Sequence, residues 1–202
     1  MKNINIFDSI EEKEKNKILK NLDTSPVLFS KKSTIIDNSN INNIIGVILK
    51  GEANVLKYDY DGNRFIIEKL EKNSLFGDIF SRFDGEIEVV AVTDCEVLLF
   101  SYEDLINKNK NRLFINNLFQ LLTYKIKKIN VQVDILSKKT IRDKLIKYFK
   151  SISNKKNIEI PFNYTDLADY LCVDRSAMMR ELKKMKDEGI IEVNGKKIKL
   201  LT

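Results

Sequence analysis

The chain of 202 residues contains no histidine, no tryptophan and only two cysteines. Without histidine, it lacks the commonest metal ligand and the commonest general base at neutral pH. Cys95 and Cys172 are too few for a disulfide framework, a zinc site or a four-cysteine iron–sulfur cluster. A catalytic triad is disfavoured as well, and the sequence has no glycine-rich phosphate loop. We therefore expect no cofactor and no enzyme activity.

Long apolar runs are also missing. Segments such as Ile44–Leu49 and Val89–Val92 are far too short to cross a bilayer. The first residues, MKNINIFDSIEEKEK, are charged where a signal peptide needs an apolar core, so we expect a cytoplasmic protein. Hydrophobic residues nevertheless make up 43% of the chain, which is enough for folded cores.

The charged residues are unevenly distributed. Residues 137–202 hold 16 Lys and Arg against 9 Asp and Glu, whereas residues 1–136 hold 19 against 20. The excess of positive charge therefore lies entirely in the last third. A basic domain beside a near-neutral body favours a polyanionic partner, most simply double-stranded DNA. The alternative is an accidental clustering in a lysine-rich chain.

Residues 1–30 favour one or two short helices, and the pattern changes at Ser33. Short apolar runs then alternate with turn residues, at positions 35–36, 44–49, 53–58, 65–70, 87–92 and 95–100. Strands at this spacing predict an antiparallel barrel or sandwich, and Asp61-Gly62 predicts a hairpin. Cys95 begins one strand, where a buried thiol usually acts as a small hydrophobe; a redox sensor is the alternative.

A heptad-like pattern spans residues 109–136. Apolar residues recur at alternating spacings of four and three, uninterrupted by glycine or proline: Ile115, Phe119, Leu122, Ile126, Ile129, Val133 and Leu136. Such a seam is typical of a helix that pairs with a second copy, so we expect a parallel homodimer. The alternative is a helix packed within its own subunit. Further apolar residues widen the N-terminal half of this face toward the β-rich body: Ile106, Leu113, Leu118, Leu121 and Val131.

The stretch 163–186 predicts two short helices joined by a tight turn. The segment 137–140 interrupts the seam as a hinge, and Thr140 is placed to cap a helix that follows. Asn163 caps the predicted helix Tyr164–Leu171, and Asp174 caps the predicted helix Arg175–Lys186. The inward positions of both helices are apolar: Leu167, Ala168, Leu171, Met178, Leu182 and Met185. Cys172 occupies the turn, where positive φ favours glycine.

The outward face of the second helix predicts a DNA-contacting surface. Arg175 and Arg180 are candidates for paired hydrogen bonds to guanine, and Lys183 for a phosphate contact. Asn194-Gly195 predicts a β-hairpin near the C-terminus, a wing whose Lys196, Lys197 and Lys199 face phosphates. The predicted DNA-binding residues are Asn163, Thr165, Asp174, Arg175, Ser176, Ala177, Met179, Arg180, Lys183, Lys196 and Lys197.

The segment ILKGEANVLKYDYDGNRFIIEKLEKNSLFGDIF resembles the β-roll of the cyclic-nucleotide-binding domain of Crp/Fnr regulators, through Gly51, Gly62 and Phe76-Gly77-Asp78. The resemblance implies an effector pocket at Phe76, Gly77, Asp78, Arg82, Gly85 and Glu86. In that family an Arg-Ser pair neutralises the cyclic phosphate, but these positions fall on Gly85-Glu86, where a carboxylate repels phosphate. We expect no response to cyclic nucleotides, and either an unidentified small-molecule effector or none.

The order of segments from about Ser33 onward resembles the whole Crp/Fnr superfamily. DLADYLCVDRSAMMRELKKMKDEGII is similar to its DNA-binding signature, and the family's base-contacting positions fall on Arg175, Ser176 and Arg180. The resemblance implies an α+β fold with a β-roll and N-terminal helices over residues 1–108, a dimerisation helix over 109–136 and a winged helix-turn-helix over 137–202.

The sequence thus favours a homodimeric, sequence-specific transcription regulator that binds double-stranded DNA, with RNA polymerase as a further candidate partner. The alternative is a small-molecule-binding module whose winged domain mediates protein contacts. We expect no metal, no cofactor and no membrane partner.

Overall fold

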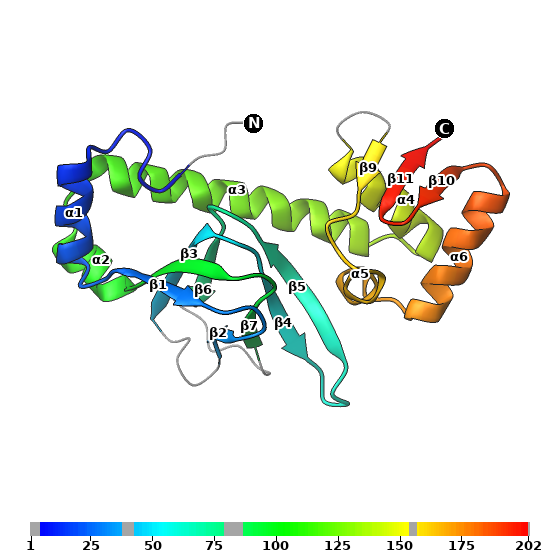
Figure 1. Ribbon diagram of the computed structural model, residues 1–202, viewed down its shortest axis with the longest axis horizontal. Coiled ribbons are helices and arrows are strands. Elements are labelled where there is room, and N and C mark those ends of the chain that lie inside the picture. Colours follow the sequence, from blue (N-terminus) through cyan, green and yellow to red (C-terminus); the bar gives the residue numbers. More distant parts are fainter. Residues whose placement is uncertain (1–4, 38–42, 79–86, 154–156, 202) are drawn as a thin grey trace. The chain divides into compact units, whose positions relative to one another are not determined.

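Residues 5–37, 43–78, 87–153 and 157–201 are described by the structure, a computed structural model (Figure 1). The chain divides into two compact units, Met1–Ile126 and Lys127–Thr202. The elements of the first unit are α1 (Glu12–Asn21), β1 (Pro26–Phe29), β2 (Thr34–Ile36), β3 (Ile44–Lys50), β4 (Ala53–Tyr58), β5 (Arg64–Leu70), β6 (Leu75–Asp78), β7 (Ile87–Ala91), β8 (Cys95–Ser101) and α2 (Tyr102–Lys108). Helix α3 (Arg112–Leu136) starts in this unit and ends in the second.

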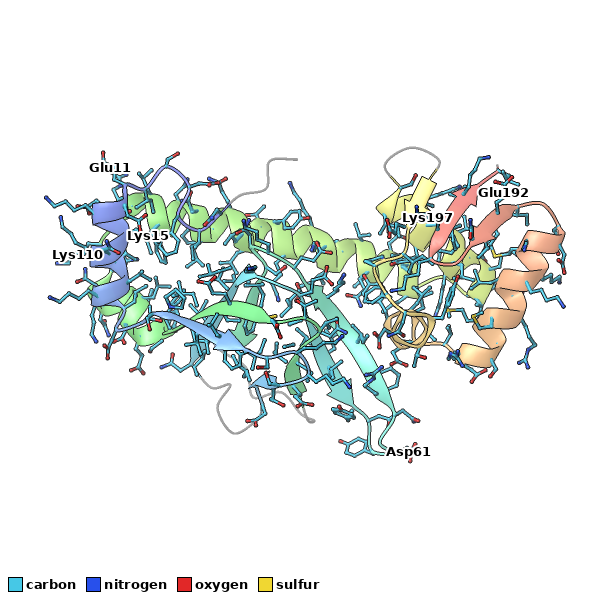
Figure 2. All side chains as sticks on the ribbon, viewed as in Figure 1. Glu11, Lys15, Asp61, Lys110, Glu192 and Lys197 are labelled. Atoms are coloured by element: carbon cyan, nitrogen blue, oxygen red, sulfur yellow. The ribbon has the colours of Figure 1, made fainter. Side chains whose placement is uncertain are left out.

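The strands of the first unit form two antiparallel four-stranded sheets, so the predicted β-rich body is confirmed. Their strand orders are β1-β8-β3-β6 and β2-β7-β4-β5. The expected hairpin is confirmed, because β4 pairs with β5 around a turn that carries Asp61 at its tip (Figure 2). Strands β5 and β6 lie at one edge of each sheet, and the chain passes directly from one to the other.

Two strands and one helix depart from the sequence prediction. Segment 26–29, expected within a helical region, forms β1 against β8. Segment 75–78, expected only to contribute Phe76, Gly77 and Asp78 to an effector pocket, forms β6 against β3. Helix α2 was not predicted as a separate element. It ends before Asn109, and Asn111 then starts α3 by accepting a hydrogen bond from the Phe114 N–H at 3.0 Å.

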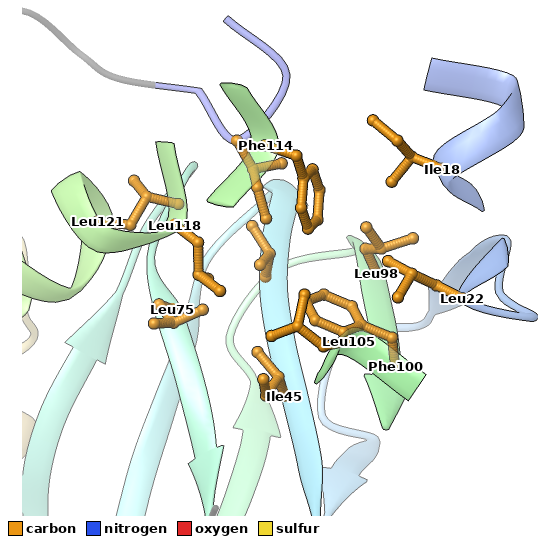
Figure 3. Close-up of a cluster of buried hydrophobic side chains, with 12 residues drawn as sticks. Ile18, Leu22, Ile45, Leu75, Leu98, Phe100, Leu105, Phe114, Leu118 and Leu121 are labelled. Carbon is orange, nitrogen blue, oxygen red and sulfur yellow. The ribbon is translucent and has the colours of Figure 1, made fainter. Parts of the chain in front are cut away.

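A buried apolar cluster joins the N-terminal part of α3 to the first unit (Figure 3). Phe114, Leu118 and Leu121 of α3 lie in it together with Ile45 of β3 and Leu75 of β6. Their spacings of four and three place the α3 residues on one helix face, as the predicted widening requires. Ile106, Leu113 and Val131 are exposed instead, so the prediction that they rest on the β-rich body is wrong.

The second unit is a winged helix. It comprises the end of α3, α4 (Ile141–Ile152), β9 (Asn157–Glu159), α5 (Tyr164–Leu171), α6 (Arg175–Asp187), β10 (Ile191–Asn194) and β11 (Lys197–Leu200). Its antiparallel sheet has the order β10-β11-β9. Thr140 caps α4 as predicted, because its Oγ1 accepts a hydrogen bond from the Asp143 N–H at 3.1 Å. Within the described ranges, no helix is long and apolar enough to span a bilayer.

Candidate nucleic-acid interface

Helix α5 begins where the sequence predicts. The Asn163 side chain accepts a hydrogen bond from the Asp166 N–H at 2.8 Å and donates one to the Asp166 carboxylate at 2.7 Å. A capped start satisfies amides that would otherwise have no partner in the first turn. Leu167, Ala168 and Leu171 are buried, as expected, and Thr165 is exposed.

The turn between α5 and α6 is left-handed at Cys172, where φ is +51°. Such a φ favours glycine, so the cysteine holds a mildly strained position, as the sequence predicts. The Cys172 N–H donates to the Asp169 carbonyl at 3.3 Å and ends the helix. Cys172 is exposed, and partial desolvation by its neighbours raises the pKa of its thiol. Cys95 is buried, which raises the pKa of its thiol, and its Sγ donates to the Glu52 carbonyl at 3.1 Å. Neither shift favours the thiolate, which is the reactive form of cysteine.

Helix α6 starts at Asp174, whose Oδ1 accepts a hydrogen bond from the Ala177 N–H at 2.7 Å. Met178, Leu182 and Met185 are buried, so one face of the helix is fixed in the core as predicted. The opposite face is therefore outward, and the predicted contact residues on it are exposed: Arg175, Ser176, Met179, Arg180 and Lys183.

An arginine of α4 contacts both Glu181 and Glu188. Arg142 Nε lies 2.5 Å from Glu181 Oε1, and Arg142 Nη1 lies 2.7 Å from Glu188 Oε2. The hydrogen bond between Arg142 and Glu188 lowers the pKa of the Glu188 carboxyl group. The contact fixes α6 against α4 and turns two carboxylates away from the outward basic face. Sequence reasoning missed it, because the arginine precedes its partners by 39 and 46 residues.

The wing consists of β10, β11 and the turn at Gly195, as Asn194-Gly195 predicts. Lys196 and Lys197 are exposed at the turn, and Figure 2 shows Lys197 there. Lys199 Nζ, in contrast, lies 3.3 Å from Glu192 Oε2 on the neighbouring strand. Lys199, expected to face phosphate, is therefore partly neutralised. The Tyr164 hydroxyl donates to the Gly195 carbonyl at 2.6 Å and connects the start of α5 to the wing, a contact that sequence reasoning also missed.

The predicted effector-pocket residues are only partly described. Phe76 is buried and its ring covers Gly46, where a Cβ would lie 2.3 Å from the ring. Gly77 has a φ of +116°, and a Cβ there would meet the Ile44 carbonyl at 2.1 Å, so only glycine fits. The backbone of Asp78 pairs with Ile44. Arg82, Gly85 and Glu86 lie outside the described residues.

The seam of α3 exposes large apolar side chains. Phe119 is 63% exposed, Ile126 58% and Val133 60%, and Ile129 is exposed as well. Ile115, Leu122 and Leu136 are half-buried, and the first two pack against the core of the first unit. A run of exposed apolar residues along one helix face is typical of an interaction surface.

Comparisons with known proteins identify both parts of the chain. Residues 26–111 match the family described as cyclic nucleotide-binding domain, and residues 143–202 match the Crp-like helix-turn-helix domain. The cAMP-activated global transcriptional regulator CRP of Pasteurella multocida is 23% identical over 183 residues, covering 84% of this chain and 87% of that protein.

A second relative matches over a shorter region. The probable transcriptional regulator flp of Lacticaseibacillus casei is 26% identical over 119 residues, so the match spans 56% of this chain and about half, 52%, of that protein.

Solved structures share the fold. A CooA mutant from Carboxydothermus hydrogenoformans superposes with a TM-score of 0.80 at 19% identity, covering 100% of this chain and 94% of that one. The c-di-GMP responsive global regulator CLP of Xanthomonas campestris gives 0.71 at 15% identity, covering 93% and 99%. With both domain families matched in this order, the chain belongs to the Crp/Fnr family of DNA-binding transcription regulators.

Proposed function

We propose that the protein is a sequence-specific regulator that binds double-stranded DNA as a homodimer and does not respond to cyclic nucleotides. The observation that carries the proposal is α6: a helix capped by Asp174, fixed in the core by its apolar face, and basic on its outward face. A helix of this kind fits the major groove, which an α-helix can enter.

Specificity would come from the first turns of α6. Arg175 and Arg180 each carry a planar guanidinium that can donate two hydrogen bonds to guanine O6 and N7. Ser176 and Ala177 are small enough to contact a base edge or a thymine methyl group, and Met179 is an exposed apolar contact. Such contacts distinguish bases by about 1–3 kcal/mol each.

Affinity common to all sequences would come from phosphate contacts. Lys183 on α6 and Lys196 and Lys197 on the wing are exposed cations. Asn163 and Thr165 lie at the start of α5, where backbone amides and short neutral side chains would contact phosphate oxygens. The Asp174 carboxylate is anionic and caps α6, so at the start of that helix the contact would come from backbone amides. These contacts position the protein but carry no sequence information.

The exposed seam of α3 supports the homodimer. Phe119, Ile126 and Val133 are each more than half exposed, which is costly unless a partner covers them. The occupant that we propose is the same seam of a second copy, since alternating spacings of four and three are self-complementary in a parallel pair. Two recognition helices would then contact half-sites about one DNA turn apart.

The β-roll would act without a cyclic nucleotide. A cyclic phosphate is anionic, and the family's phosphate-neutralising positions correspond to Gly85-Glu86 in this sequence. The regulator would therefore respond to an unidentified small molecule or to none, and RNA polymerase is the partner expected of a protein that activates transcription. Because its target is chromosomal DNA, we place it in the cytoplasm.

The alternative function is a small-molecule-binding module whose winged domain contacts proteins. The basic outward face of α6 and the lysines of the wing favour DNA instead. Selection of bound fragments from random-sequence DNA by the purified full chain separates the two. We expect a near-palindromic site with half-sites about 10–11 base pairs apart. Recovery of no shared sequence would contradict the proposal.

A further inference from the structure

One lysine of α3 is directed at the β-rich body rather than at solvent. Lys125 Nζ lies 2.5 Å from Glu68 Oε2 and donates a second hydrogen bond to the Leu75 carbonyl at 3.0 Å. The Lys125 side chain is 26% exposed and that of Glu68 only 13%. The next lysine along the helix, Lys127, is exposed.

The two partners of Lys125 come from different sheets. Glu68 lies in β5, the edge strand of one sheet, and Leu75 is the first residue of β6, the edge strand of the other. Lys125 therefore joins one edge strand of each sheet to α3. The Leu75 side chain lies near Leu118 and Leu121, so the lysine contact comes one helical turn beyond the apolar contacts (Figure 3).

The position of Lys125 on the helix determines what this contact can do. Phe114, Leu118, Leu121 and Lys125 follow one another at spacings of four, three and four, so they share one face of α3. Ile126, the next residue, points about 100° away around the helix axis and is 58% exposed in the seam. Holding Lys125 on the β-roll therefore fixes the direction in which the seam faces.

The half-buried Lys125 ammonium favours one rotational orientation of α3 over others. Its charge loses much of its hydration, and only groups in definite positions compensate for that loss. A rotation of α3 would remove Lys125 from Glu68 and from the Leu75 carbonyl together. An apolar contact would tolerate such a rotation more easily, because dispersion and burial have little dependence on direction. The pair thus defines one rotational setting of the helix.

Strand β6 also leads directly into residues 79–86, where the resemblance to Crp/Fnr proteins implies an effector segment. We propose that Lys125 is a positioning residue that sets the rotation of α3 by its own charge, so that the seam is presented for DNA-competent dimerisation without a bound small molecule. This inference rests on the proposed function. No separate molecule is needed, because the groups that bind Lys125 belong to the chain itself: the Glu68 carboxylate on β5 and the Leu75 carbonyl on β6.

The test compares ligand-free full-length Lys125→Gln, Glu68→Gln and Lys125→Arg with wild type, using the DNA site selected by wild type. Lys125→Arg retains a cation with several donors, and Lys127→Gln is the matched control on an exposed neighbour. Dimer dissociation is measured by sedimentation, and DNA affinity by fluorescence anisotropy at concentrations where every variant is dimeric. Thermal unfolding shows that each variant is folded.

We expect both glutamine variants to bind the selected site about tenfold more weakly as folded dimers, the size of a typical coupling between sites. Lys125→Arg and Lys127→Gln should remain close to wild type. The inference is overturned if the glutamine dimers bind DNA as tightly as wild type, or if their losses follow dimer dissociation alone. If Lys125→Gln does not fold, the DNA affinity of the Glu68→Gln dimer tests the inference, because this change keeps the size and shape of the side chain. If wild type itself selects no DNA site, the proposed function fails instead.

Discussion

Asp134, near the end of α3, lies 2.5 Å from the Nζ of Lys147 in α4, across the segment 137–140 that separates the two helices. Lys138 Nζ lies 2.7 Å from the other carboxylate oxygen. Hydrogen bonds from Lys138 and Lys147 lower the pKa of Asp134 from 3.8 to about 2. The predicted hinge is therefore held by an ionic contact that depends on the charge of one carboxylate.

The first prediction concerns pH. Because the pKa of Asp134 is lower in the folded chain, its contacts stabilise the fold above pH 3.8, and this contribution disappears as the pH falls toward 2. Carboxyl-carbon NMR should show Asp134 still ionised at pH 3. Lys138→Met and Lys147→Met should each raise its pKa toward 3.8, whereas Lys139→Met should not. An ordinary pKa for Asp134 in wild type would contradict the contact.

The second prediction uses two phenylalanines of α3. Phe114 is fully buried and Phe119 is 63% exposed. Phe114→Ala should lower the free energy of unfolding by about 3–5 kcal/mol, because it leaves a cavity in the core. Phe119→Ala should weaken dimerisation instead, so its effect on urea unfolding should grow with protein concentration. If both variants lose the same free energy of unfolding at every protein concentration, Phe119 has no partner in the dimer.

The third prediction concerns the seam. Replacing Ile126 and Ile129 by Glu places like charges where two copies meet, so the chain should sediment as a folded monomer and lose the selected DNA site. Lys127→Glu, an exposed change on the same helix, is the control and should remain dimeric. A stable dimer in the double variant would show that the copies associate through another surface.

The fourth prediction separates base contacts from phosphate contacts. Arg175→Ala and Arg180→Ala should each cost about 1–3 kcal/mol on the selected site and relax specificity at one position. Lys197→Ala should weaken binding to all sequences alike and reduce the salt slope by about 1. Anisotropy titrations on selected and scrambled DNA at several salt concentrations measure both. If the arginine variants lose the same affinity for selected and for scrambled DNA, Arg175 and Arg180 are not base contacts.

The DNA-binding unit was the most predictable part of the chain, because its signals are local. Asn163 and Asp174 cap helices whose first residues follow immediately, so α5 is predicted to the residue and α6 to within one. The positive φ at Cys172 is likewise implied by its place in the turn. Caps and turns depend on neighbours within a few residues, which a sequence displays directly.

The missed elements depend on distant partners. Strands β1 and β6 have only four residues each and are extended because they pair with β8 and β3. In the sequence, Lys125 is one of several polar residues between the apolar positions of the seam. Its role becomes visible only in the fold, where it contacts Glu68, a residue 57 positions earlier in the chain. The contacts of Arg142 with Glu181 and Glu188 could not be predicted for the same reason, since 39 and 46 positions separate the partners. Pairings over such separations leave no periodic pattern in the sequence.

The most direct test of the central claim is the affinity of the ligand-free full chain for its selected DNA site, compared with a scrambled duplex at the same salt concentration. The account predicts a preference of about 1,000-fold or more, unchanged when cyclic AMP is added. Equal affinity for both duplexes, or a preference that appears only with cyclic AMP, would contradict it.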